Sequence, residues 1–81
     1  MKIKQNLAMS DTGFLFNPGN GDSFSVNPIG LEIIQLIKSG QDAAAIKGTL
    51  LEAYAIDSDT LEKDIYDFLN TLRRHKLVHE A

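Results

Sequence analysis

Few side chains in this sequence have the type and spacing that chemistry at a site requires. His75 and His79 lie near the C-terminus, but no cysteine or carboxylate accompanies them at metal-ligand spacing. Residues 17–22 (NPGNGD) lack the spacing of a calcium loop and the lysine and Ser/Thr of a phosphate loop. No nucleophile–base pair is visible either. We therefore expect no metal, no cofactor and no catalytic centre.

Charge is distributed unevenly along the last third of the chain. Asp57, Asp59 and Glu62 come early in that segment, and residues 73–76 (RRHK) end it. Acids at the start of a helix and bases at its end complement the helix dipole, which explains this arrangement without a ligand. Binding of phosphate or of an acidic peptide by the basic run is the functional alternative.

The chemistry that remains is that of the main chain. In residues 21–30 (GDSFSVNPIG), polar and apolar residues alternate from Ser23 to Val26 and then meet Asn27-Pro28. Alternation is typical of a half-buried strand, and Asn followed by Pro is typical of a helix start. A strand whose edge is unpaired can accept a guest peptide as an additional strand.

Two more strands are expected before this one. Residues 3–9 alternate, with their lysines on the polar face, and residues 14–16 form a second short apolar run. A turn at residues 11–13 and a hairpin loop at residues 17–22 predict an antiparallel meander. Because lysines discourage pairing at a sheet edge, the first strand is protected and the third is the open edge.

Everything after Val26 has helical periodicity. The expected N-caps are Asn27, Asp42 and Asp57, and Ser39-Gly40 is expected to end the first helix. Each helix has an apolar stripe: Ile29, Ile33, Leu36 and Ile37; Ile46, Leu50, Leu51 and Tyr54; Leu61, Ile65, Phe68, Leu69 and Leu72. The predicted fold class is α+β, a three-stranded antiparallel sheet followed by three helices, similar to a winged helix-turn-helix.

Composition limits the remaining possibilities. The chain has 81 residues, 43% of them apolar, and no cysteine, which suits one domain (residues 1–81) in the reducing cytoplasm. It has no apolar run long enough for a membrane span and no signal peptide, so no membrane partner is expected. The net charge of −3 argues against a nucleic-acid partner.

Four stretches together resemble the PqqD family, the small peptide chaperones of pyrroloquinoline quinone synthesis and the wider set of RiPP recognition elements. They are FLFNPGNGDSFSVN (14–27), NPIG (27–30), AAAIKGTLLEAYAID (43–57) and LEKDIYDFLNTLRRHKLV (61–78). The resemblance covers about residues 5–79. One departure is Lys76, where relatives often have glycine before the final Leu-Val; lysine would be strained in a left-handed cap, so the helix end is expected to differ.

The resemblance implies a non-catalytic domain that binds the leader of a ribosomally synthesised precursor peptide and presents it to a modifying enzyme, often a radical SAM enzyme. The leader would pair with the third strand, in a groove bounded by the third helix. The site residues expected on this basis are Asp22, Ser23, Phe24, Ser25, Val26, Asp64, Tyr66, Phe68 and Leu69.

Several alternatives stay open at this point. A core role competes with a groove role for Phe14, Phe16, Phe24, Val26 and Phe68. A winged helix-turn-helix DNA-binding regulator is the alternative function, although acids populate the helix that would recognise DNA. The oligomeric state is either a monomer or a dimer paired through the third strand.

Overall fold

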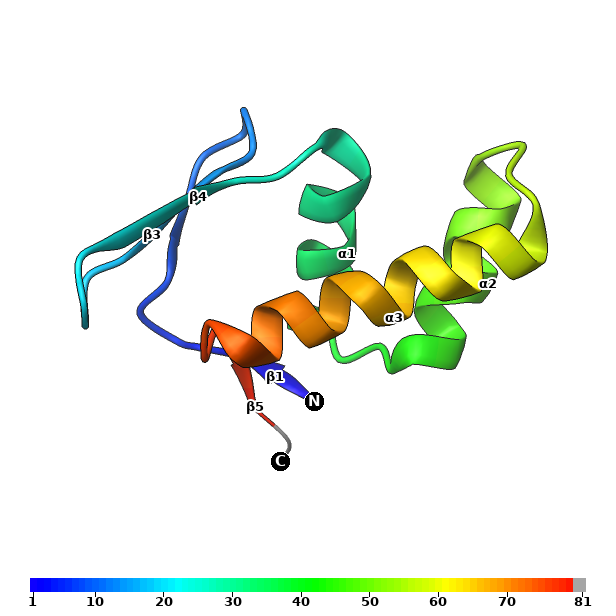
Figure 1. Cartoon of the computed structure of the whole chain (residues 1–81). Coiled ribbons are helices and arrows are strands. Elements are labelled where there is room, and N and C mark those ends of the chain that lie inside the picture. The colour runs from blue at the N-terminus through cyan, green and yellow to red at the C-terminus, as the bar shows by residue number, and fades with distance from the viewer. Residues whose placement is uncertain (80–81) are drawn as a thin grey trace.

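The chain passes through a small sheet before it reaches its helices (Figure 1). The structure is a computed structural model that describes residues 1–79. One antiparallel sheet contains, in spatial order, β2 (Ala8–Met9), β3 (Phe14–Asn17) and β4 (Asp22–Ser25). Three helices follow: α1 (Pro28–Lys38), α2 (Ala43–Ala53) and α3 (Ser58–Arg74). The predicted fold class is confirmed.

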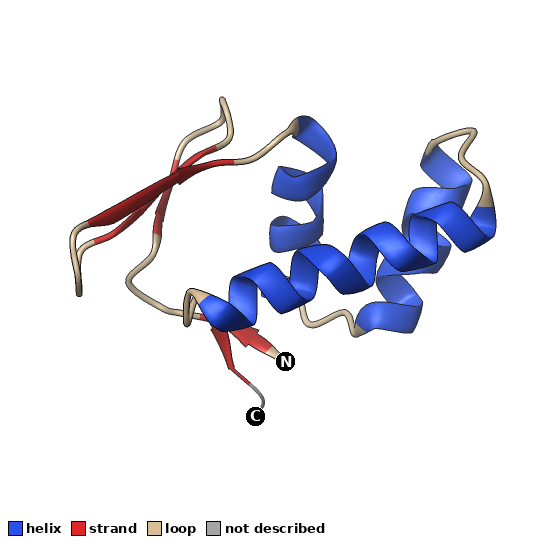
Figure 2. Ribbon diagram, viewed as in Figure 1, coloured by secondary structure: helices blue, strands red, loops and turns tan. Residues whose placement is uncertain are grey.

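Figure 2 shows the sheet at one end of the molecule and the helices beside it. Helix α3 crosses beneath α1 and returns from α2 toward the sheet. No helix within residues 1–79 is long and apolar enough to cross a membrane.

The two turns of the sheet lie where the sequence predicts them. Residues 18–21 join β3 to β4, and the Gly21 amide donates to the Asn17 carbonyl at 2.8 Å with Gly21 at φ +79°. Gly13, at φ +89°, lies against β4 so closely that a Cβ would come within 2.4 Å of the Val26 carbonyl oxygen. Glycine is therefore required at residue 13 for both its backbone conformation and its size.

The continuous first strand expected over residues 3–9 is wrong. The Leu7 amide donates to the Lys4 carbonyl at 3.2 Å, and this turn divides the segment into β1 (Lys2–Ile3) and β2. β1 pairs antiparallel with β5 (Val78–His79) and forms a second, two-stranded sheet. His79 pairs with Lys2 in this sheet, and residues 80–81 lie outside the described residues.

The far edge of the larger sheet, formed by β2, is also not protected by lysines as expected. β2 contains no lysine, because Lys2 lies in β1 and Lys4 lies in the turn between the two strands. The β2 edge is only two residues long, and short length is a different way of limiting pairing with another chain.

All three predicted N-caps are confirmed. Asn27 Oδ1 accepts from the Gly30 amide at 2.7 Å, and Asp42 Oδ1 accepts from the Ala45 amide at 2.9 Å. Asp57 Oδ2 accepts from both the amide and the hydroxyl of Thr60, which lowers the pKa of the Asp57 carboxyl. These bonds satisfy amides that have no partner within their own helix.

Helices α1 and α3 end in the same way. Gly40, at φ +97°, follows α1, and the Gln41 amide donates to the Leu36 carbonyl. After α3, Lys76 takes φ +57° and the Leu77 amide donates to the Leu72 carbonyl at 2.9 Å. This is a Schellman cap made with lysine, so the expected departure at this helix end is wrong.

The core lies between the inner sheet face and the helices, and it does not include every predicted side chain. Leu15, Ile46, Leu50 and Leu69 are completely buried. Phe14 and Phe16 point to the outer face of the sheet and are 48% and 39% exposed, so the core role that was left open for them is wrong. Leu51 and Tyr54, expected on the buried stripe of α2, are exposed too.

Candidate functional site

β4 is an edge strand with one free side. It pairs only with β3, in a register that places Phe24 opposite Leu15 and Ser25 opposite Phe14. The Val26 amide donates inward to the Gly13 carbonyl at 2.8 Å. Because the main-chain groups of successive residues point to opposite sides of a strand, those of Ser23 and Ser25 point outward. No strand of the described chain pairs with them.

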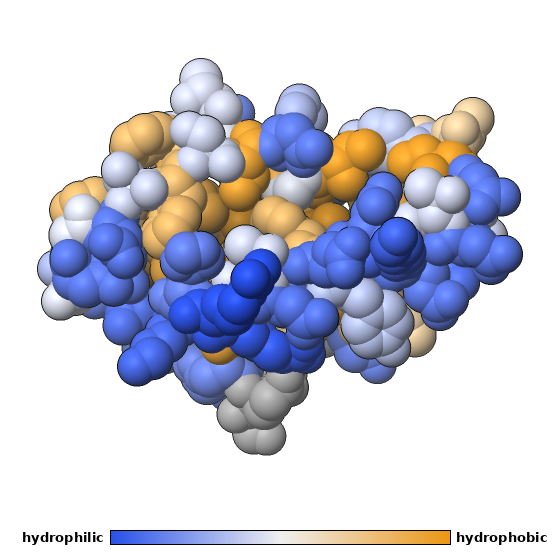
Figure 3. Space-filling model, in the orientation of Figure 1, coloured by the Kyte–Doolittle hydropathy of each residue, from blue (hydrophilic) through white to orange (hydrophobic). Residues whose placement is uncertain are grey.

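A groove runs beside this edge, between β4 and the C-terminal half of α3. Its volume is about 300 Å³, and we call it the edge groove. Phe24, Ser25 and Val26 line it from the strand side, and Phe68, Thr71 and His75 line it from the helix side. Figure 3 shows orange, apolar side chains gathered in the hollow above α3, whereas the outer surface of α3 is blue.

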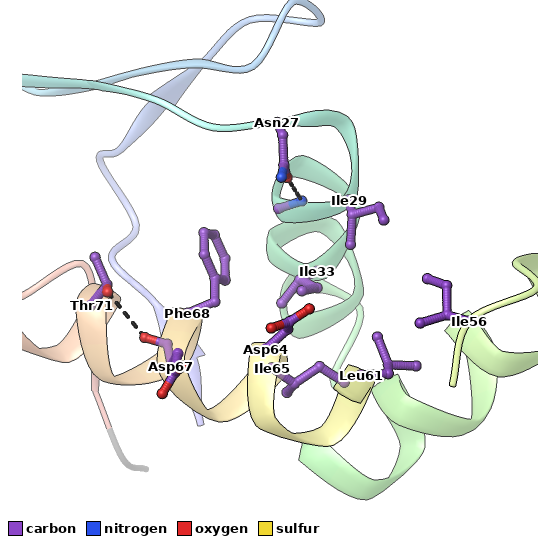
Figure 4. A pocket seen from close by; sticks show the side chains of 11 residues that line it. Asn27, Ile29, Ile33, Ile56, Leu61, Asp64, Ile65, Asp67, Phe68 and Thr71 are labelled. Carbon is purple, nitrogen blue, oxygen red and sulfur yellow. Dashed lines mark hydrogen bonds between the residues drawn. The ribbon is translucent and has the colours of Figure 1, made fainter. Parts of the chain in front are cut away.

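A second hollow continues the edge groove past the end of β4. It has a volume of about 410 Å³, and we call it the helix pocket. The two cavities share Asn27, Phe68 and Thr71. The remaining wall of the helix pocket comes from α1, α3 and the segment between α2 and α3: Ile29, Gly30, Ile33, Ile56, Leu61, Asp64, Ile65 and Asp67. Figure 4 shows Phe68 and Asp64 rising from α3 toward α1.

Two side-chain contacts, one by Phe68 and one by Phe24, border the edge groove and the helix pocket. Gly30 has no side chain, and a Cβ there would lie 3.1 Å from Cε1 of Phe68, so the ring packs directly against the first turn of α1. At the other end the ring of Phe24 lies 4.6 Å from the His75 ring, centroid to centroid. Phe24 and Phe68 therefore form apolar walls that a guest side chain can contact.

The structure brings together some of the sequence-predicted site residues and separates others from them. Phe24, Ser25, Val26, Asp64 and Phe68 line the edge groove or the helix pocket. Ser23 contributes an outward main-chain edge. Asp22 is exposed at the loop end of β4 and lines neither cavity.

Two predicted residues lie away from the groove. Leu69 is completely buried, so it supports α3 from within the core and has no surface to offer a ligand. Tyr66 is 55% exposed and lines a different hollow, between α2 and α3, beside the Lys47–Glu62 ion pair. Residues 64 and 66 are about 200° apart on a helix, so one groove cannot receive both. Tyr66 therefore lies outside the edge groove and the helix pocket, and its peptide-binding role stays a prediction.

Sequence reasoning missed several lining residues, of which Thr71 and His75 were accessible to it. Asp64, Phe68, Thr71 and His75 follow one another at spacings of four, three and four, which places them on one face of α3. Extending the stripe from Asp64 and Phe68 would have found the other two. Asn27 and Ile29 gave no comparable signal, because their place in the wall depends on how α1 packs over α3.

Electrostatic character changes along the cavity. Asp64 and Asp67 line the helix pocket, whereas His75 lines the edge groove and its sequence neighbours Arg74 and Lys76 are exposed. No group of three or more metal-binding side chains occurs within residues 1–79. The arrangement offers main-chain hydrogen bonds and apolar pockets, which are the means by which a sheet edge recognises an extended peptide.

Fold and site together define a small winged helix-turn-helix domain in which an unpaired strand edge borders an apolar groove. The chain belongs to the PqqD family: the family model described as coenzyme PQQ synthesis protein D (PqqD) matches residues 12–78. No curated protein sequence matches it significantly.

Two solved structures are similar to this one. The first is TbiB1 in complex with the TbiA(beta) leader peptide, with a TM-score of 0.88 and 27% sequence identity, covering 100% of this chain and 98% of that one. The second is a lasso peptide synthetase B1 complexed with the leader peptide, with a TM-score of 0.79. Its sequence identity is 21% and it covers 91% of both chains, so it supports the fold alone.

Proposed function

We propose that this protein is a peptide chaperone that binds the leader of a ribosomally synthesised precursor peptide and presents it to a modifying enzyme. The leader is added as a strand along the free edge of β4. Its side chains on one face enter the edge groove between β4 and α3. The whole chain serves as one peptide-binding domain in the cytoplasm, where ribosomal precursors are made.

The observation that carries this proposal is the outward main chain of Ser23 and Ser25 beside an apolar cavity. Hydrogen bonds to these groups would supply affinity that does not depend on guest sequence, and alternate guest side chains would supply specificity. Family membership and the similarity to TbiB1, which was solved with a leader peptide, support the same use of the fold.

The role proposed is binding without catalysis by this domain. Chemistry on the precursor is assigned to the partner enzyme, for which a radical SAM enzyme is one class. No observation favours the DNA-binding alternative. Asp59, Glu62 and Asp67 are all exposed on α3, the helix that would face DNA, and their charges would repel the phosphates.

The test is calorimetric titration with the N-terminal half of the precursor peptide encoded beside this gene. Ser25→Pro removes one outward amide from β4 without touching a bond to β3, and proline is tolerated on the free side of an edge strand. We expect Ser25→Pro to weaken binding at least about tenfold. Ser25→Ala is the matched control, because it retains the amide and should bind like the wild type.

Equal affinity of Ser25→Pro and the wild type would overturn strand addition at β4. The circular dichroism spectrum of each variant shows whether the fold is retained. Size-exclusion chromatography of the free protein distinguishes a monomer from a dimer paired through the same edge.

A further inference from the structure

We propose that the helix pocket receives a lysine or arginine side chain of the guest peptide. The aliphatic stem would lie on the apolar floor, and the cationic group would reach Asp64 and Asp67. This inference rests on the proposed function, because the pocket continues the edge groove through Asn27, Phe68 and Thr71. A guest strand that follows β4 therefore enters it.

The floor of the helix pocket suits a long, unbranched stem. Ile33 and Leu61 are buried beneath it, and Ile29 is partly exposed at its wall. Gly30 has no side chain, so the Phe68 ring packs against the backbone of α1 at this residue and forms the pocket surface beside it. Lys and Arg side chains commonly lay their methylene groups on such apolar surface while the charged head stays near water.

The acidic residues of the helix pocket favour a cationic group at the end of the guest side chain. Asp64 and Asp67 are the charged residues that line the pocket, and they lie one turn apart on α3. Within residues 1–79 neither carboxylate forms an ion pair or a side-chain hydrogen bond; Asp67 is bonded only through its main-chain carbonyl, to the Thr71 hydroxyl. Both acids lie beyond the first turn of the 17-residue helix, where the helix dipole no longer favours negative charge.

Other guest side chains fit this pocket less well. An acidic residue would be repelled by both carboxylates. A large apolar residue would take water away from Asp64 without supplying a partner, and an unpaired desolvated charge is costly. A basic residue instead brings a positive charge to two acids that have no ion-pair partner within residues 1–79. Figure 4 shows Asp64 between Phe68 and Leu61 on the pocket side of α3.

The experiment selects binders from a display library of random peptides about twelve residues long, which would extend roughly 40 Å as a strand. That length spans the 36 Å long axis of the molecule. Selection is run on the wild type, on Asp64→Asn/Asp67→Asn, and on Glu52→Gln/Asp59→Asn. The last is a matched control, since it removes two exposed acids that line neither cavity.

We expect the wild type and the control to enrich Lys or Arg at one fixed position relative to the apolar residues. The Asp64→Asn/Asp67→Asn variant should keep the apolar pattern and lose the basic preference. In one enriched peptide, replacing the basic residue with norleucine should weaken binding to the wild type about five- to tenfold. The same replacement should leave binding to the double variant unchanged.

The two proposals fail in different ways. Enriched peptides that lose binding to Ser25→Pro but show no basic preference would overturn the acidic-pocket inference and leave strand addition standing. Enriched peptides whose binding is insensitive to Ser25→Pro would overturn strand addition, and the inference with it. A selection that enriches no peptide would count against both.

Discussion

The ring of Phe24 on β4 lies 4.6 Å from the ring of His75 at the end of α3, with the two planes tilted by 58°. This contact joins the edge strand to the last turn of the helix at the end of the edge groove opposite the helix pocket. β4 and the end of α3 are therefore in direct contact at this end of the edge groove.

This contact should be measurable as a coupling energy. In a double-mutant cycle of Phe24→Leu and His75→Ala, we expect the unfolding free energies to be non-additive by about 0.5–1.5 kcal/mol, the usual range for aromatic pairs. Urea unfolding of the four proteins measures it. Additive losses would mean that the rings do not interact in solution.

Lys76 is the one non-glycine residue at positive φ within residues 1–79. Lys76→Gly should raise the unfolding free energy by about 1 kcal/mol, because glycine adopts the left-handed conformation without steric cost. Lys63→Gly, inside α3, is the matched control and should lower it by about the same amount. A loss of stability in Lys76→Gly, measured by urea unfolding, would show that residue 76 is not left-handed.

Gly30 and Gly48 both lie in helices but should respond differently to alanine. Nothing lies within 4 Å of a Cβ at Gly48, so Gly48→Ala should stabilise the protein by about 1 kcal/mol. At Gly30 the new Cβ meets the Phe68 ring at 3.1 Å and Asn27 Oδ1 at 3.2 Å, which offsets that gain. Thermal unfolding compares the two variants, and equal stabilisation would contradict the close packing of Phe68 on α1.

The N-cap at Asp57 should make the free energy of unfolding decrease at acidic pH. Bonds from Thr60 lower the pKa of Asp57 below its ordinary value of 3.8. A carboxyl with a lowered folded-state pKa stabilises the protein above its unfolded pKa, and this stabilisation is lost as pH falls through the folded pKa.

Asp57→Asn keeps a good cap without a titrating group. The melting temperature of Asp57→Asn should therefore fall less steeply than that of the wild type between about pH 5 and pH 2. Parallel curves for the two proteins would exclude Asp57 as a source of the pH dependence.

Local signals in the sequence were sufficient for the helices and the hairpin. Asn27, Asp42 and Asp57 cap the predicted helices because an N-cap depends on one side chain and amides two or three residues away. The turn glycines are equally local. The alternation from Ser23 to Val26 correctly placed Phe24 and Val26 on one face, since the two faces of that strand differ in polarity.

The tertiary structure decided what local patterns left ambiguous. In Phe14-Leu15-Phe16 both strand faces are apolar, so alternation could not say that Leu15 would be buried and the phenylalanines exposed. The same limit applies to Tyr66. The sequence could not show that its side of α3 faces α2, because that depends on how the two helices pack.

The sequence by itself therefore determined the three helices, the β3–β4 hairpin, their order and the family resemblance, because each of these depends on neighbours along the chain. Only the tertiary structure decided that β1 pairs with β5 from the opposite end of the chain, and that α1 and α3 enclose a pocket beside β4. Contacts between residues far apart in sequence depend on how whole elements pack, and no short run of residues encodes that packing.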